Sequence, residues 1–93
     1  MNEFDNRVNK ASALCQQMID ITVNNSFKSE LKDIKSSIEF SAPEIFNFHF
    51  NRITECVNKL VQGKTKETVT DSEIAVLAVF TKKTPKQIRK CFH

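Results

Sequence analysis

The residues best suited to chemistry are lysines and arginines gathered in the last third of the chain. Residues 62–93 carry seven basic and three acidic side chains, whereas residues 1–61 carry seven basic and eight acidic ones. The formal charge of +3 therefore comes entirely from the C-terminal third. The cations that we take as candidates for binding phosphate groups are Lys82, Lys83, Lys86, Arg89 and Lys90. Charge gathered in this way predicts an acidic partner, most often a nucleic acid.

Other reactive residue types lack the spacing that catalysis or metal binding requires. Cys15, Cys56 and Cys91 lie far apart and form no C-x₂-C pair, so we expect small buried thiols and neither a disulfide framework nor a metal site. His49 has no serine, cysteine or carboxylate at helical spacing to complete a catalytic triad. Because glycine-rich loops and paired carboxylates are also missing from the sequence, we expect a protein that is not an enzyme and needs no cofactor.

The elements that position these side chains are expected to be helices, which makes the fold class all-α. Apolar residues recur at steps of three and four, the period of a helix with one buried face. One glycine and two prolines are few for a fold rich in hairpins. The sequence predicts a single domain, residues 1–93, with small orthogonal or bundle-like packing of four to five helices near residues 3–23, 27–39, 42–62, 71–81 and 85–92.

Capping signals support these boundaries. In a capping box, two side chains three residues apart each accept a hydrogen bond from the other's backbone N–H. The sequence has three such pairs, which are Ser41 with Glu44, Thr70 with Glu73, and Thr84 with Gln87. Asn2 is predicted to cap the first helix, and residues 24–26 offer a cap for the second. Gly63, the only glycine, is expected to follow the third helix in the left-handed region.

Two stretches are also compatible with strands. Residues 45–50 alternate between apolar and polar, and residues 74–80 are seven consecutive apolar residues with several β-branched side chains. We favour helix for both stretches, because a capping box precedes each of them. A helix that is apolar on all sides, as the second would be, is expected to be fully buried.

The apolar faces predict a core drawn from all five helices. Its expected members are Phe4, Val8, Cys15, Met18, Leu31, Ile34, Phe46, Phe50, Ile53, Val57, Leu60, Leu77 and Ile88. Phe48 falls outside this face and projects toward the polar side of its helix, which also carries Arg52. Either another helix covers Phe48, or it marks a contact with a partner. We take Phe48 and Arg52 as candidate contacts and expect a homodimer, because so small a chain buries little surface alone.

The last two predicted helices resemble a helix-turn-helix module. Leu77 and Ala78 match the apolar residue and the alanine that this family has in its first helix. Thr84 matches the residue that caps the second helix, and Ile88 and Cys91 match its two buried positions. The resemblance implies that the second helix is a recognition helix whose cationic side faces DNA.

Two features depart from that family. Its turn usually carries glycine and then an apolar residue, where this chain has Lys82 and Lys83, and the second helix is shorter than most recognition helices. The run Gln87-Ile88-Arg89, followed by Phe92, is nevertheless similar to homeodomain-type members. The resemblance covers residues 71–93, and its arginine is the candidate for contact with a base.

These observations predict a small cytoplasmic protein that binds nucleic acid, with DNA as the expected form, and acts as a regulator. The alternative is a small helical adaptor or inhibitor that binds a larger protein through its basic face and Phe48. No apolar run approaches the length of about 20 residues that spans a bilayer, so we expect no membrane partner. The N-terminus also lacks the basic-then-apolar layout of a signal peptide.

Overall fold

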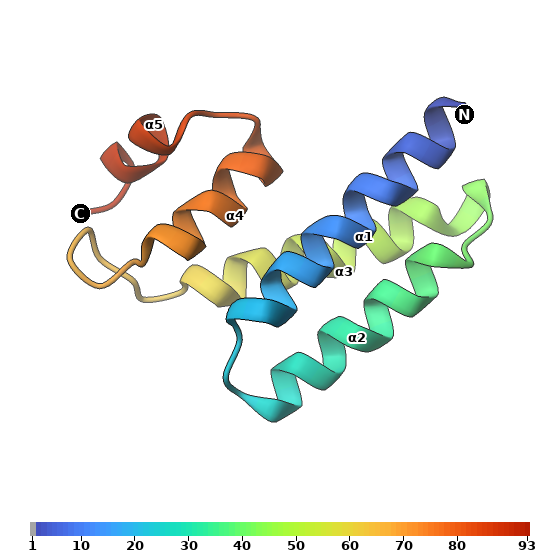
Figure 1. The fold of residues 1–93 in the computed structure, drawn as a ribbon, viewed down its shortest axis with the longest axis horizontal. Coiled ribbons are helices and arrows are strands. Elements are labelled where there is room, and N and C mark those ends of the chain that lie inside the picture. Colours follow the sequence, from blue (N-terminus) through green and yellow to red (C-terminus); the bar gives the residue numbers. More distant parts are fainter. Residues whose placement is uncertain (1) are drawn as a thin grey trace.

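The computed structural model describes residues 2–93 and confirms the expected all-α fold class (Figure 1). Its helices are α1 (Glu3–Ile21), α2 (Asn25–Glu39), α3 (Pro43–Val61), α4 (Asp71–Thr81) and α5 (Pro85–Lys90). No residue between 2 and 93 lies in a strand, and both stretches that were compatible with strands are helical.

The first three helices form the body of the molecule, each running antiparallel to the one before it (Figure 1). Helix α4 packs against α1 and α3 at one end of this body. Helix α5 packs against α4 and against no other helix. The position of α5 relative to the body therefore depends entirely on α4 and on the loop that precedes α4.

Two clusters of buried side chains stabilise this arrangement. The larger lies among α1, α2 and α3 and takes in Val76 of α4, whereas the smaller joins Val69, Ile74 and Ile88 across the loop, α4 and α5. Leu77 packs against both clusters. Every predicted core residue belongs to one cluster or packs against it. Those that are only partly buried are Phe4, Val8, Phe50, Leu60 and Leu77.

Most of the predicted helix caps are confirmed. The Asn2 side chain accepts a hydrogen bond from the N–H of Asp5 at 2.8 Å, and Asn24 caps α2 in the same way. Both capping boxes of the C-terminal half are closed in both directions. Gly63 follows α3 with a φ of +75°, in the left-handed region that glycine adopts without strain.

The capping box predicted at Ser41 and Glu44 is wrong. Helix α3 begins at Pro43 with Ala42 as its N-cap, which forms no side-chain hydrogen bond. The Ser41 hydroxyl instead donates to the carbonyl oxygen of Ile38 at 3.0 Å, at the end of α2. Because the turn between the two helices is short, the unpaired carbonyls of α2 compete with the start of α3 for this hydroxyl.

Several helix ends differ from their predicted positions by one or two residues. Helix α2 begins two residues early, at Asn25, whereas α1 ends two residues early and α3 is one residue shorter at each end. Helix α5 ends at Lys90, two residues before the predicted end. The carbonyl oxygen of His93 accepts a hydrogen bond from the N–H of Lys66 at 3.1 Å, so the last residues turn toward the loop after α3.

Two predictions about burial are also wrong. The side chains of residues 74–80 are not all buried, because α4 packs against the body on one side and α5 on another, which leaves a third side partly open. Val79 lies on that side and is 56% exposed. Cys91 is exposed as well; it follows the last residue of α5 as the C-cap, and its thiol donates to the carbonyl oxygen of Gln87 at 3.5 Å.

Cys15 and Cys56 are buried free thiols, as expected. Burial raises the pKa of Cys15 to about 12, and the nearby Cys56 adds to the increase. Burial likewise raises the pKa of Cys56 to about 11, with the Glu30 carboxylate as the next cause. An ordinary thiol has a pKa near 8.5, so the folded state holds these two protons more tightly than the unfolded chain does.

We therefore expect one thiol of three to react quickly with Ellman's reagent at about pH 8. Cys91 is exposed and should react in the native protein, whereas Cys15 and Cys56 should react only after unfolding. A Cys91→Ser variant is the control and should show no fast phase. A fast phase of more than one thiol in the native protein would contradict the burial of the other two.

The same pKa shifts set the direction of a pH dependence. Because folding raises the pKa of both thiols, their ionisation does not lower the free energy of unfolding below about pH 8.5. The free energy of unfolding then falls as the pH rises toward 11 and 12.

Candidate nucleic-acid interface

Helices α4 and α5 form a pair joined by a turn at residues 82–84. Ile74 of α4 and Ile88 of α5 are buried in the same small cluster. The hydroxyl of Thr84 accepts from the N–H of Gln87 at 3.2 Å, and the Gln87 side chain accepts from the N–H of Thr84 at 3.0 Å. The capping box starts α5 at a defined residue, and the buried Ile88 decides which side of α5 faces α4.

Lys82 occupies the turn in a conformation that glycine favours. Its φ of 61° and ψ of 27° lie in the left-handed region, and it is the only non-glycine residue with a positive φ between residues 2 and 93. For a residue with a Cβ this conformation costs about 1–2 kcal/mol. Lys82 thus has a glycine-like backbone at the place where a helix-turn-helix usually has glycine.

Four of the five candidate cations are exposed and free of ion pairs. At about 100° per residue, Lys86 and Lys90 lie on the side of α5 opposite Ile88. Lys82 and Lys83 extend this charge onto the turn, and all four lysines are exposed. None of them takes part in an ion pair with any residue of the described chain. The ammonium groups are therefore available to a ligand.

Arg89 is placed differently from the other four. Its guanidinium donates to the carboxylate of Asp71, the first residue of α4, so it is turned toward α4 and away from the outer side of α5. The Asp71 side chain is 97% exposed, and a surface pair of this kind contributes at most about 1 kcal/mol. A hollow of about 460 Å³ lies beside the pair, between α4 and α5, and is edged by Lys86. A ligand bound there could exchange the carboxylate for its own anionic group.

The second pair of candidate residues lies on α3, which does not pack against α5. Phe48 is 66% exposed and is covered by no other helix, while Ile45, one turn earlier, is also exposed. The Arg52 guanidinium donates to Asp33 of α2 at 3.1 Å. The ring of His49 stands edge-on to Phe48, and its Nδ1 is buried without a hydrogen-bond partner among residues 2–93. This end of α3 presents a small exposed apolar patch.

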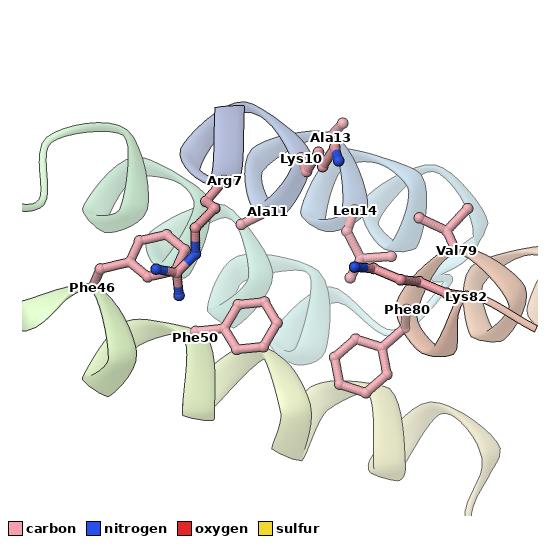
Figure 2. Close-up of a pocket in the computed structure, with 10 residues that line it drawn as sticks. All are labelled: Arg7, Lys10, Ala11, Ala13, Leu14, Phe46, Phe50, Val79, Phe80 and Lys82. Carbon is pink, nitrogen blue, oxygen red and sulfur yellow. The ribbon is translucent and has the colours of Figure 1, made fainter. Parts of the chain in front are cut away.

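The sequence analysis missed a groove of about 680 Å³ between α1, α3 and α4 (Figure 2). It is lined by Arg7, Lys10, Ala11, Ala13, Leu14, Phe46, Phe50, Val79, Phe80 and Lys82. The signal that could have indicated it is the apolar run of α4. The consecutive apolar residues 74–80 occupy all sides of a helix, which gives α4 more apolar surface than its three neighbours cover.

The rest of the described chain adds no further candidate site. Residues 2–93 contain no group of three or more side chains that could hold a metal ion. None of the five helices is long and apolar enough to cross a bilayer. Comparison of the chain with protein-family models, with curated proteins and with solved structures found no match. Function is therefore inferred from the geometry of this chain.

The backbone of Lys82 leads to a prediction about stability. Replacing Lys82 by glycine removes the strain of a side chain in the left-handed region, but makes the unfolded chain more flexible. We expect Lys82→Gly to raise the free energy of unfolding by about 0.5–1 kcal/mol in urea titrations followed by circular dichroism.

Lys83→Gly is the matched control for this prediction. It removes the same charge from the same turn, but at a residue whose φ is not positive. It should lower the free energy of unfolding by about 0.5–1 kcal/mol. Equal effects of the two substitutions would mean that the turn does not hold Lys82 in the left-handed region.

Proposed function

We propose that the protein binds nucleic acid, with DNA as the expected form, through the turn after α4 and the outer side of α5. The observation that carries this proposal is the set of four unpaired lysines, of which Lys86 and Lys90 lie on the side of α5 opposite the buried Ile88 and Lys82 and Lys83 lie in the turn before it. A recognition helix needs this division between an apolar side that packs on its partner helix and a cationic side that faces phosphates. The protein acts as a small regulator.

The dimensions of α5 favour contact with phosphates over reading of bases. Its six residues span about 9 Å, whereas the major groove of B-DNA is about 12 Å wide. A helix this short can contact few base edges from one position. Affinity then comes mainly from lysines that replace counterions on the backbone, and Arg89, whose planar fork suits guanine, would have to leave Asp71 to reach a base.

The cytoplasm is the compartment that suits this activity. All three cysteines are free thiols, which is typical of proteins in a reducing compartment.

Fluorescence anisotropy with a labelled random-sequence duplex tests the proposal. If each of the four lysines contacts one phosphate, log K should fall with log salt at a slope of about −3.6. Lys86→Glu/Lys90→Glu should weaken binding at least tenfold at about 50 mM salt and flatten the slope by about two. Neither substitution should alter the helical circular dichroism, because both side chains are exposed.

Lys28→Glu/Lys32→Glu on α2 is the matched control. It makes the same change in net charge on a helix that contacts neither α4 nor α5. It should weaken binding by less than threefold. If both double variants weaken binding equally, or if the unchanged protein does not bind the duplex, nucleic-acid binding through α5 is refuted.

A homodimer through α3 accompanies this function in our proposal. The exposed Phe48 and its neighbour Ile45 form the apolar centre of the contact, and Arg52, paired with Asp33, lies at its edge. Two copies related by a two-fold axis suit a protein that reads successive half-sites on DNA. The same exposed patch favours the second candidate function, a small adaptor or inhibitor that binds a larger protein.

Light scattering at tens of micromolar protein should give the mass of a dimer, and Phe48→Asp should reduce it to the mass of a monomer. A charge in the centre of a small apolar contact is desolvated without a partner, which weakens association strongly. Phe40→Asp is the control, because Phe40 is even more exposed but lies outside α3. A monomer mass for the unchanged protein would exclude the dimer and leave the patch to another partner.

A further inference from the structure

Three aromatic rings lie in a row along the groove between α1, α3 and α4 (Figure 2). Phe46 and Phe50 of α3 are stacked with ring centroids 5.9 Å apart, and Phe50 and Phe80 of α4 are stacked at 6.0 Å. The planes within each pair lie within about 20° of one another. Phe46 is buried, with the Arg7 guanidinium over its ring, so the open part of the floor is formed by Phe50 and Phe80, whose centroids are 6.0 Å apart.

The walls of the groove are also apolar, and part of them is open to solvent. Ala13 on the α1 side is exposed, and Val79 on the α4 side is 56% exposed. Leu14 lies between them, deeper in the molecule. A ligand could cover the open parts of both walls without displacing the core below.

The charged residues around the groove are all positive. Arg7 lies at one end, with its guanidinium carbon 4.7 Å from the centre of the Phe46 ring, and Lys82 lies at the other end beside Phe80 (Figure 2). Lys10 stands on the α1 side, and no acidic residue lines the groove. Positive charge is thus distributed along the whole length of an apolar surface.

We propose that this groove binds an acidic amphipathic helix of a partner protein. An α-helix rises about 6 Å in four residues, so a helix that follows the groove brings two apolar side chains four residues apart over Phe50 and Phe80. Acidic residues beside that apolar stripe would meet the cations at both ends and on the α1 side. This surface shares Lys82 with the proposed nucleic-acid surface but is otherwise separate from the outer side of α5, and the proposal does not depend on nucleic-acid binding.

The distribution of charge and the chain's own exposed residues favour this occupant over two others. An anionic lipid carries its charge at one end and would leave the cation at the opposite end of the groove unpaired. A second copy of this chain offers no suitable helix. Among residues 2–93, no helix carries more than two exposed large apolar side chains, and the helix with two is α3, with Ile45 and Phe48. Neither occupant matches both the spacing of Phe50 and Phe80 and the spread of charge.

The test uses a labelled helical peptide of about four turns, with leucine at alternating steps of three and four and glutamate at most other positions. We expect saturable binding to the full-length protein by fluorescence anisotropy. A peptide of the same composition with scattered leucines, and one with lysine in place of glutamate, should each bind at least tenfold more weakly.

Val79→Glu should weaken peptide binding at least tenfold, because it puts a like charge on the groove wall at a position that is already exposed. Val23→Glu is the matched control, since Val23 is almost fully exposed outside the groove and the substitution changes the same residue type. It should change binding by less than twofold. Lys86→Glu/Lys90→Glu should leave peptide binding unchanged, which separates this site from the one on α5.

Several results would overturn the proposal. These are no binding at about 100 μM protein, equal binding of the scattered-leucine peptide, or equal effects of the substitutions at Val79 and Val23. Binding of oleate that is lost in Val79→Glu, without binding of the peptide, would assign the groove to an anionic lipid. A dimer that is lost in Val79→Glu but kept in Val23→Glu would assign it to a second copy of the chain.

Discussion

Helix α4 must bury apolar side chains on more than one side, and the C-terminal half of the protein depends on how it does so. Val76 enters the main cluster with the first three helices, Ile74 enters the small cluster with α5, and Leu77 packs against both. The free energy of burying these side chains holds α4 to the body and α5 to α4. Because α5 packs against no other helix, loss of the small cluster would release it.

The packing of α5 against α4 also determines which side of α5 its charged side chains occupy. Once Ile88 is fixed against α4, the helical period places Lys86 and Lys90 on the outer side of α5. The turn that reverses the chain needs one residue in the left-handed region, and Lys82 provides it. The strain is small enough to be offset by the capping box of Thr84 and Gln87, which follows the turn. The outward position of Lys86 and Lys90 is thus a consequence of packing an apolar seam.

The third side of α4 explains the groove. Helices α1, α3 and α5 together do not cover all the apolar side chains of α4, so Val79 is left partly exposed on the wall of the groove. Lys82 closes one end of this groove and is also the first cation of the turn before α5. The two surfaces that we propose for ligands therefore meet at one residue, Lys82.

The sequence by itself determined the helices, because the signals that start them act within four residues. The boxes at Thr70 and Thr84, the cap at Asn2 and the glycine after α3 all form from neighbouring residues and needed no distant partner. Most of the core was also predictable, since each amphipathic helix has only one side that can be buried.

The tertiary structure decided two kinds of feature. One is the choice between competing hydrogen-bond partners, and the other is contact between elements that are far apart in sequence. The Ser41 hydroxyl had two possible partners within reach, and the preceding helix took it. The contact between Arg89 and Asp71, 18 residues apart, and the exposure of Val79 follow from the angle at which helices pack. The groove joins Arg7, Phe46 and Phe80, whose proximity no local pattern encodes. Such features arise from side chains that are far apart in sequence, where local periodicity carries no information about orientation.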